Sequence, residues 1–336
     1  MITEATKKLV QGESLDFDTA CAVMNEMMSG EATNSQMASF LTALRMKGET
    51  IDEITACAQV MRDKAVHINT DKDILDIVGT GGDGIGTFNI STTASFIIAA
   101  AGINVAKHGN RSMSSKSGSA DCLEHLGINI TISAERSKEI LEEIGICFMF
   151  AQGYHKSMKF VGPVRKEIGI RNVFNILGPL TNPANANMQV MGVYSEELLE
   201  PLARVLSNLG VERGMTIYGC DGMDEATVTT KTKICEINKG EFKTYEITPQ
   251  DVGLNSYTMD DLIGGDGELN AGLTRDILSD KLKGAMYEIV LLNAGLGIYV
   301  GGKADTIKEG IDVAKEMIES GKALKKLNEF VELSNR

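Results

Sequence analysis

Apolar side chains in the first 70 residues recur at the spacing of one face of an α-helix. One such set is Met37, Phe40, Leu41 and Leu44. The same spacing begins again after Thr50, which forms a capping-box pattern with Glu53. Glycines separate these segments, and no proline occurs before Pro163. The pattern predicts a small all-helical domain over residues 1–70.

From Ile74 onward, short apolar runs are followed by glycine-rich loops and then by helical segments. The runs are ILDIV (74–78), INVAKH (103–108) and MTIYGC (215–220). This alternation is typical of βαβ units and predicts a larger α/β domain whose mainly parallel central sheet is flanked by helices. A segment with three prolines interrupts it, and we expect residues 163–185 to join the helical domain. The α/β domain would then comprise residues 71–162 and 186–336.

Composition narrows the class of protein. The chain has 33 basic and 46 acidic residues, a net charge of 33 − 46 = −13, so most of its surface would repel nucleic acid or an anionic membrane. No stretch approaches the ~20 apolar residues that a membrane helix needs. Six cysteines, none in a C-x-x-C pair, indicate reduced thiols. We therefore expect a cytoplasmic protein that binds neither nucleic acid nor membrane.

A glycine-rich segment, GTGGDG at 79–84, follows the first predicted strand and precedes a predicted helix that begins near Asn89. Such a turn presents backbone N–H groups and the positive end of a helix dipole to a phosphate. A plain tight turn is the alternative. The segment also fits G-x-G-x-x-G, but a dinucleotide fold expects an acidic residue about 20 positions later, where this chain has Lys107 and His108. No lysine of a Walker A loop follows the last glycine.

A second segment, residues 107–119, carries four potentially cationic side chains, five serines and no acidic residue. Cations, hydroxyl groups and backbone amides together match the oxygens of a polyphosphate. The alternative is a solvated charged surface.

Two further segments carry candidate chemistry. Asp224 and Glu225 follow a predicted strand, and adjacent carboxylates can share a hard cation such as Mg²⁺ with substrate phosphates, although a solvated loop is the common alternative. Residues 151–171 contain Arg165 and Arg171. An arginine here could bind a substrate carboxylate through its planar fork, or form an interface salt bridge.

These segments together resemble the anthranilate phosphoribosyltransferase family. The resemblance rests on GTGGDGIGTFNIST (79–92), KHGNRSMSSKSGSADCLEHLG (107–127), PVRKEIGIRNVFNILGPLTNPA (163–184) and DGMDE (221–225). It implies transfer of the phosphoribosyl group of 5-phosphoribosyl pyrophosphate to the amine of anthranilate. It also implies a homodimer formed through the helical domain, and Mg²⁺ as cofactor, expected as two ions bound with the pyrophosphate.

The resemblance also implies roles for individual residues. The phosphoribosyl pyrophosphate site would comprise Gly79, Gly82, Asp83, Thr87, Asn89, Ile90, Ser91, Thr92, Lys107, His108, Gly109, Asn110, Arg111, Ser112, Met113, Ser114, Ser115 and Ser119. Anthranilate would contact Gly79, His108, Asn110 and Arg165. Ser91, Asp224 and Glu225 would bind the metal, and Lys107, Asp224 and Glu225 would be catalytic. Two alternatives stay open: a pyrimidine nucleoside phosphorylase of the same fold, and a non-catalytic relative that binds nucleic acid.

Overall fold

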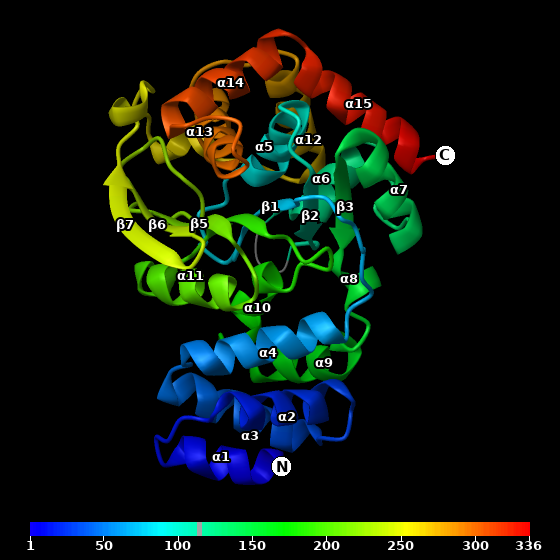
Figure 1. The fold of residues 1–336 in the computed structure, drawn as a ribbon, viewed down its shortest axis with the longest axis vertical. Helices are drawn as coiled ribbons and strands as arrows, with labels where there is room; N and C mark the ends of the chain where they lie inside the picture. The colour runs from blue at the N-terminus through cyan, green and yellow to red at the C-terminus, as the bar shows by residue number, and fades with distance from the viewer. Residues whose placement is uncertain (113–115) are drawn as a thin grey trace.

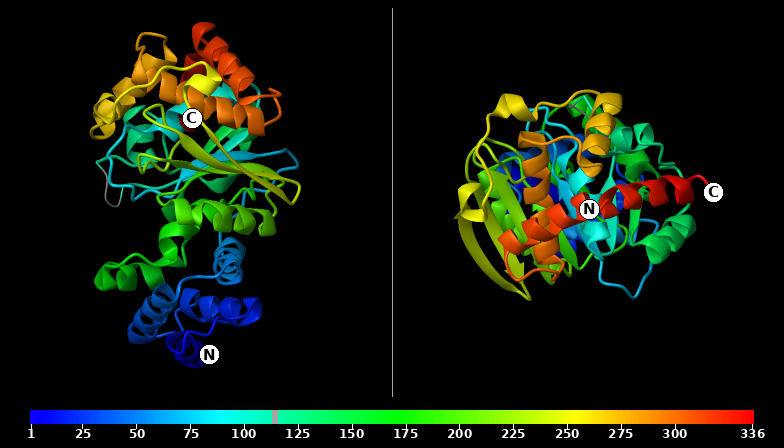
Figure 2. Two further views of the ribbon diagram at one scale, coloured as in Figure 1. Left: turned by 90° about the vertical axis from the view of Figure 1, so that its left-hand side faces the viewer. Right: turned by 90° about the horizontal axis from the view of Figure 1, so that it is seen from above.

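A computed structural model describes residues 1–112 and 116–336 of the chain, so the expected roles of Met113, Ser114 and Ser115 lie outside the described residues. A group of helices forms one end of the molecule and carries the N-terminus (Figure 1). A sheet and the helices that cover it form the other end (Figures 1 and 2). The predicted fold class is therefore confirmed.

The helices at the N-terminal end are α1 (Ile2–Val10), α2 (Phe17–Met28), α3 (Asn34–Lys47) and α4 (Ile51–Asp63). Helix α4 begins at the predicted capping box. The Thr50 hydroxyl accepts a hydrogen bond from the Glu53 amide at 3.2 Å, and the Glu53 carboxylate accepts one from the Thr50 amide at 2.8 Å. The Lys47 ammonium also donates to Glu53 at 2.8 Å, which compensates the charge of this buried carboxylate.

Two later helices, α9 (Met158–Ile168) and α10 (Phe174–Leu180), pack against this group. Buried Val161 and Leu177 belong to the same hydrophobic cluster as the first four helices. Helix α11 (Leu199–Asn208), which the predicted boundaries assign to the other domain, contributes to this cluster too and contacts the sheet. The domain boundaries therefore stay a prediction.

Within the described residues, seven strands form one sheet in the order β3-β2-β1-β4-β5-β6-β7. They are β1 (Leu75–Gly79), β2 (Val105–Gly109), β3 (Ile146–Phe150), β4 (Met188–Gly192), β5 (Arg213–Gly219), β6 (Thr232–Asn238) and β7 (Glu241–Ile247). The first five in chain order pair in parallel, and β6 and β7 extend the sheet in antiparallel pairing.

The remaining helices are α5 (Ile90–Ala100), α6 (Ser119–His125), α7 (Ala134–Ile144), α8 (Ala151–Tyr154), α12 (Gly267–Leu278), α13 (Ala285–Val300), α14 (Ile307–Glu319) and α15 (Lys322–Ser334). Short 3₁₀ turns are η1 (Glu196–Leu198), η2 (Gln250–Val252) and η3 (Met259–Leu262). Helices α5, α13 and α14 cover the face of the sheet that points away from the N-terminal helices (Figure 1). Within the described ranges, no helix combines the length and apolar character needed to cross a membrane.

The strand order places a natural binding crevice at β1. The chain runs from β1 to β2 on one side, whereas β4 lies on the other side, so connections leave this point in opposite directions. In open α/β sheets, ligands bind beyond the carboxyl ends of the strands at such a switch point. Helices α10 and α11 lie between this sheet and the N-terminal helices, so the helical end approaches the same crevice (Figure 1).

Candidate active site

A cavity of about 410 Å³ lies at the carboxyl ends of β1 and β2. Every described residue of the predicted site lines it. These residues are Gly79, Gly82, Asp83, Thr87, Asn89, Ile90, Ser91, Thr92, Lys107, His108, Gly109, Asn110, Arg111, Ser112, Ser119, Arg165, Asp224 and Glu225. Segments up to about 145 residues apart in the chain thus converge on one site.

The glycine loop after β1 adopts a backbone that other residues rarely accept. Gly81, Gly82, Gly84 and Gly86 have φ values between 70° and 80°. The loop leads into α5, whose N-cap residue Asn89 makes no side-chain capping bond. Its side chain instead bonds Ser117 and Asn270. Residues 89–92, at the N-terminus of α5, line the cavity, so the positive end of the helix dipole faces it. This arrangement favours a bound anion.

Two other glycines are required because the loop that carries Asp224 packs directly on the ends of β1 and β4. A Cβ atom on Gly79 would lie 2.3 Å from the Asp224 carboxylate, and one on Gly192 would lie 1.6 Å from the Asp224 carbonyl oxygen. Gly79 and Gly192 are also paired across the sheet. The absence of both side chains lets Asp224 reach the glycine loop.

The two predicted metal ligands accept hydrogen bonds from backbone amides of the glycine loop and of the first turn of α5. Asp224 accepts a hydrogen bond from the Gly81 amide at 2.5 Å, and Glu225 accepts one from the Ser91 amide at 3.2 Å. Burial raises the pKa of Asp224 well above its usual range, and the neighbouring Asp83 and Glu225 raise it further. Burial likewise raises the pKa of Glu225 to about 7, although Lys107 opposes this shift.

These carboxylates fit a divalent cation by their chemistry, because a cation would relieve both their burial and their mutual repulsion. In the part of the chain that the structure describes, no group of three or more His, Cys, Asp or Glu side chains is arranged to hold a metal ion. A metal here would need oxygen ligands from elsewhere, such as a hydroxyl group or substrate phosphates. That ligand set is the one Mg²⁺ prefers.

Lys107 is a buried cation beside these groups. Its side chain is 3% exposed, and its ammonium donates to the Ile77 carbonyl and, at 3.3 Å, to the Ser91 hydroxyl. Burial lowers the pKa of Lys107, while Asp76, Glu225 and Asp224 counteract that shift. The ammonium is therefore fixed under the glycine loop, close to the N-terminus of α5.

The sequence predicts that the Arg111 cation faces a polyphosphate, whereas in the structure its guanidinium is paired with two carboxylates. Its guanidinium forms ion pairs with Asp121 at 3.0 Å and with Glu124, to which a second contact measures 2.9 Å. It also lies 5.6 Å from the centre of the Phe150 ring. Both carboxylates lie one turn apart on the following helix, α6, outside the 107–119 segment. The composition of that segment alone therefore did not indicate these partners.

Helices α9 and α10 form another wall of the cavity, which includes the apolar side chains of Phe174 and Pro179. The Arg165 guanidinium lies 5.2 Å from the centre of the Phe174 ring, and burial lowers its pKa. Within the described residues Arg165 forms no salt bridge. Its donors stay available for a carboxylate in the cavity.

His108 lies between the two walls. Its Nδ1 is 3.1 Å from the Gly178 carbonyl oxygen, and its Nε2 is buried without a hydrogen-bond partner among the described residues. Burial, together with His155 at 5.0 Å between ring centres, lowers the pKa of His108 to about 3. The imidazole is therefore neutral near pH 7, and its Nδ1 donates to Gly178.

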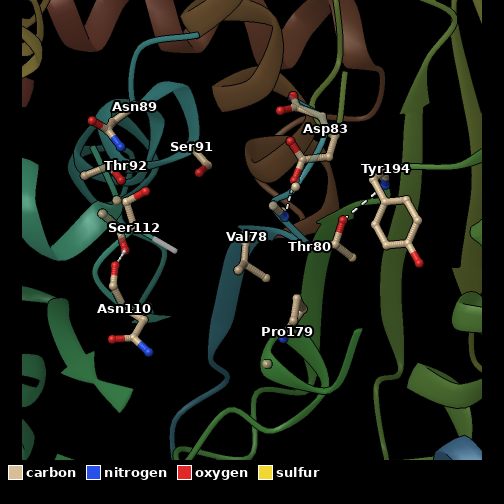
Figure 3. Close-up of a pocket in the computed structure, with 18 of the residues that line it drawn as sticks. Val78, Thr80, Asp83, Asn89, Ser91, Thr92, Asn110, Ser112, Pro179 and Tyr194 are labelled. Atoms are coloured by element: carbon tan, nitrogen blue, oxygen red, sulfur yellow. Dashed lines mark hydrogen bonds between the residues drawn. The ribbon is translucent and has the colours of Figure 1, made fainter. Parts of the chain in front are cut away.

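Several lining residues were given no individual role from the sequence, although some of them lie within the predicted 79–84 and 107–119 segments. They are Val78, Thr80, Gly81, Gly86, Phe88, Ser117, Gly118, Phe174, Asn175, Gly178, Pro179 and Tyr194, together with Arg171, whose role was left open. Thr80 and Tyr194 lie side by side, and the Tyr194 amide donates to the Thr80 hydroxyl at 3.1 Å (Figure 3). Glycine-motif neighbours such as Thr80 had a signal in the sequence. Tyr194 had none, because its place depends on β4 pairing with β1.

Comparisons with known proteins agree with the fold and the site. A family model described as the glycosyl transferase family, a/b domain, matches residues 71–324. A second, the glycosyl transferase family helical bundle domain, matches residues 3–65. Together these matches span most of the chain and define it as a glycosyltransferase.

More specific relatives follow. The anthranilate phosphoribosyltransferase of Ruminiclostridium cellulolyticum is 54% identical over 335 residues, covering 100% of this chain and 98% of the relative. That of Methanobrevibacter smithii is 53% identical and covers 100% of both chains. The chain therefore belongs to the anthranilate phosphoribosyltransferase family, as its sequence motifs predicted.

Solved structures agree. The crystal structure of anthranilate phosphoribosyltransferase from Thermus thermophilus superposes with a TM-score of 0.94 at 44% identity, over 99% of each chain. The Saccharomyces cerevisiae enzyme, in complex with PRPP (5-phosphoribosyl pyrophosphate) and Mg, gives 0.92 at 28% identity, over 99% of this chain and 98% of that one.

Proposed function

We propose that this enzyme transfers the phosphoribosyl group of 5-phosphoribosyl pyrophosphate to the amine of anthranilate, giving N-(5-phosphoribosyl)anthranilate and pyrophosphate. The observation that carries this proposal is the convergence of the glycine loop, Lys107 and the Asp224-Glu225 pair on one cavity. The complexes of the yeast relative with PRPP and Mg, and with 4-fluoroanthranilate, support it.

The donor substrate would occupy the side of the cavity that the glycine loop and α5 form. Backbone amides of the loop, the N-terminus of α5 and the hydroxyls of Ser91 and Thr92 suit phosphate oxygens. As the bond between C1 of the ribose and pyrophosphate breaks, negative charge accumulates on the leaving group. Lys107 is held where its positive charge can stabilise that group. Asp83, Thr87 and residues of the 107–119 segment complete the proposed site.

Mg²⁺, as two ions, would bind to Asp224, Glu225 and the Ser91 hydroxyl. When bound, it neutralises charge on the pyrophosphate oxygens. The burial and the repulsion between neighbouring carboxylates that raise these pKa values support this assignment, because a divalent cation would relieve both and stabilise the ionised forms.

Anthranilate would occupy the side of the cavity near Arg165. The Arg165 fork matches a carboxylate in a bidentate contact, and Asn110, His108 and Gly79 line the same space. The amine of anthranilate is neutral near pH 7, so its lone pair needs no base to release it. The lowered pKa of His108 supports this arrangement, because a neutral imidazole whose Nδ1 donates to Gly178 has only an acceptor at Nε2 and cannot donate a hydrogen bond to the amine lone pair.

A fluorescence assay tests the proposal directly. We expect anthranilate fluorescence to fall only when both phosphoribosyl pyrophosphate and Mg²⁺ are present, with pyrophosphate released in equal amount. No loss of anthranilate, together with phosphorolysis of thymidine or uridine, would instead identify a nucleoside phosphorylase. A salt-dependent shift of DNA with no turnover of either kind would identify a nucleic-acid-binding relative.

The proposed homodimer through the helical domain has support in the exposure of large apolar side chains. Met1 is 67% exposed, Val10 74% and Met46 84%. Burial of these side chains against a second copy of the chain would remove apolar surface from water, which favours association. Light scattering at micromolar concentration tests this, and we expect M46E to shift the protein toward monomers. A cytoplasmic location remains part of the proposal, and the six free cysteines are consistent with it.

A further inference from the structure

Arg171 links the glycine loop, proposed to bind phosphoribosyl pyrophosphate, to the wall of the cavity proposed to bind anthranilate. It lies in the link between α9 and α10, two residues after Gly169 ends α9 in a left-handed conformation. Its guanidinium donates a hydrogen bond to the Gly82 carbonyl of the glycine loop. The same group lies 4.1 Å from the centre of the Tyr194 ring, which is within cation-π distance.

The glycine loop needs such a contact because it has little else to restrain its tip. Gly81 and Gly82 have φ values of 70° and 77°, and glycine carries no side chain that could pack. The two ends of the loop are held by hydrogen bonds from the Thr80 amide to Gly192 at 2.9 Å, from the Gly81 amide to Asp224 and from the Gly264 amide to the Gly86 carbonyl at 3.0 Å. At the tip, the bond from the Ile85 amide to the Asp83 carboxylate at 3.2 Å lies within the loop itself and does not tie it to another element. Ordering a glycine-rich segment costs more conformational entropy than ordering any other. A carbonyl contact at Gly82 removes part of that cost before substrate arrives.

The element that supplies Arg171 belongs to the wall that α9 and α10 form. Arg165 lies on α9, and Phe174, which packs under its guanidinium, begins α10. Helix α9 packs on α2 and α3 of the N-terminal helices. The hydrogen bond from Arg171 to Gly82 therefore joins the wall proposed to bind anthranilate to the loop proposed to bind phosphoribosyl pyrophosphate.

Arg171 is not placed like a ligand of the anthranilate carboxylate. One edge of its guanidinium is already used by the Gly82 carbonyl, and one face is covered by Tyr194. A Cβ atom on Gly82 would lie 3.3 Å from its Nη2 atom, so the contact also depends on glycine at this position. Arg165, which has no carboxylate or carbonyl partner in the described residues, is the arginine free for that role.

We propose that Arg171 is a positioning residue for the donor substrate: by bonding Gly82 and stacking on Tyr194, it preorganises the glycine loop for phosphoribosyl pyrophosphate. The inference rests on the proposed function for the identity of the donor. It assigns Arg171 an effect on the loop even when no substrate is bound, and this distinguishes it from a direct ligand.

The test compares R171M, which keeps the alkyl stem but removes the donors, with the matched control R204M. Arg204 is also stacked on a ring, Phe242 at 4.9 Å, and hydrogen-bonded to Glu200, but on α11 away from the cavity. We expect R171M to raise the KM of phosphoribosyl pyrophosphate by about tenfold and to leave the KM of anthranilate within about twofold. R204M should match the wild type in both.

Hydrogen exchange of the substrate-free protein is the second measurement. Amides of residues 80–86 should exchange at least several-fold faster in R171M, whereas those of β5 and β6 should be unchanged, which excludes global destabilisation. R171K, which retains a cationic donor group but loses the planar guanidinium that stacks on Tyr194, should fall between R171M and the wild type in both measurements.

Three results would overturn the proposal. Unchanged exchange of the loop with a raised KM for phosphoribosyl pyrophosphate would make Arg171 a direct phosphate ligand. A raised KM for anthranilate alone would make it a carboxylate ligand. No change in either measurement would leave it without a role. A wild-type protein that fails to consume anthranilate would instead contradict the proposed function, and the exchange experiment would still report on the loop.

Discussion

A carboxylate oxygen of Asp224 lies 2.5 Å from the backbone nitrogen of Gly81, although 143 residues separate them in the chain. This bond joins the acidic pair after β5 to the glycine loop after β1. It places the negative charge proposed to hold Mg²⁺ directly beside the amides proposed to hold phosphate. A cation is needed for both to act together, because a phosphate beside an unneutralised carboxylate would be repelled.

The first prediction concerns these carboxylates. We expect D224N and E225Q each to lower kcat by about a hundredfold at saturating substrates, because they remove charge that would hold Mg²⁺ beside the leaving group. Asparagine still offers an oxygen to the Gly81 amide, so D224N should keep the thermal stability of the substrate-free protein. The measurement is kcat as a function of Mg²⁺ concentration. A dependence on Mg²⁺ identical to that of the wild type in both variants would refute the metal assignment.

The second prediction concerns Arg165. Replacing it by alanine should raise the KM of anthranilate by about tenfold or more, because a charged donor of a carboxylate is lost. The KM of phosphoribosyl pyrophosphate should change by less than about threefold. Initial rates with each substrate varied in turn provide both constants. The assignment fails if the larger effect falls on phosphoribosyl pyrophosphate.

The third prediction concerns Gly192, where an added Cβ would lie 1.6 Å from the Asp224 carbonyl oxygen. We expect G192A to destabilise the fold by about 2 kcal/mol or more and to abolish activity, because the backbone of the Asp224 loop must move. Gly272 in α12 is a matched control, since a Cβ there meets nothing within 4 Å. G272A should stabilise the protein by about 0.5–1 kcal/mol. Urea unfolding of both variants checks the pair.

The fourth prediction concerns pH. Burial lowers the pKa of His155 to about 4 from its ordinary 6.5. Between pH 6.5 and 4 the unfolded chain therefore binds a proton at this residue that the folded protein does not, and stability falls as pH falls through this window. Asp76 acts in the opposite direction, because burial raises its pKa to about 6 and folding then favours its protonated form.

The contribution of His155 can be isolated as a difference between two proteins. Urea unfolding of the wild type and of H155Q, both without Mg²⁺, should show the wild type losing up to about 1.4 kcal/mol more per pH unit than the variant between pH 6.5 and 4. Parallel stability curves would show that His155 titrates normally in the folded protein.

The residues of the proposed donor site could be predicted from the sequence because they lie in a few contiguous segments. The glycine run begins at the last residue of β1, the Lys107-His108 pair lies at the carboxyl end of β2, and the Asp224-Glu225 pair follows β5. The predicted capping box at Thr50 marks a helix boundary that the structure confirms. These signals depend on spacings of a few residues, which local backbone geometry governs.

Other features of the site depend on contacts between distant segments, which only the tertiary structure shows. Tyr194 and Arg171 meet because β4 pairs with β1 and because the α9–α10 link reaches the same edge of the sheet. Arg111 turns to Asp121 and Glu124, and the pKa values of His108 and Asp224 follow from burial that no local pattern reports. Strand order, burial and partners far apart in the chain depend on how the whole core packs. The sequence by itself therefore determined which groups are candidates for the proposed chemistry, and the tertiary structure decided which of them meet.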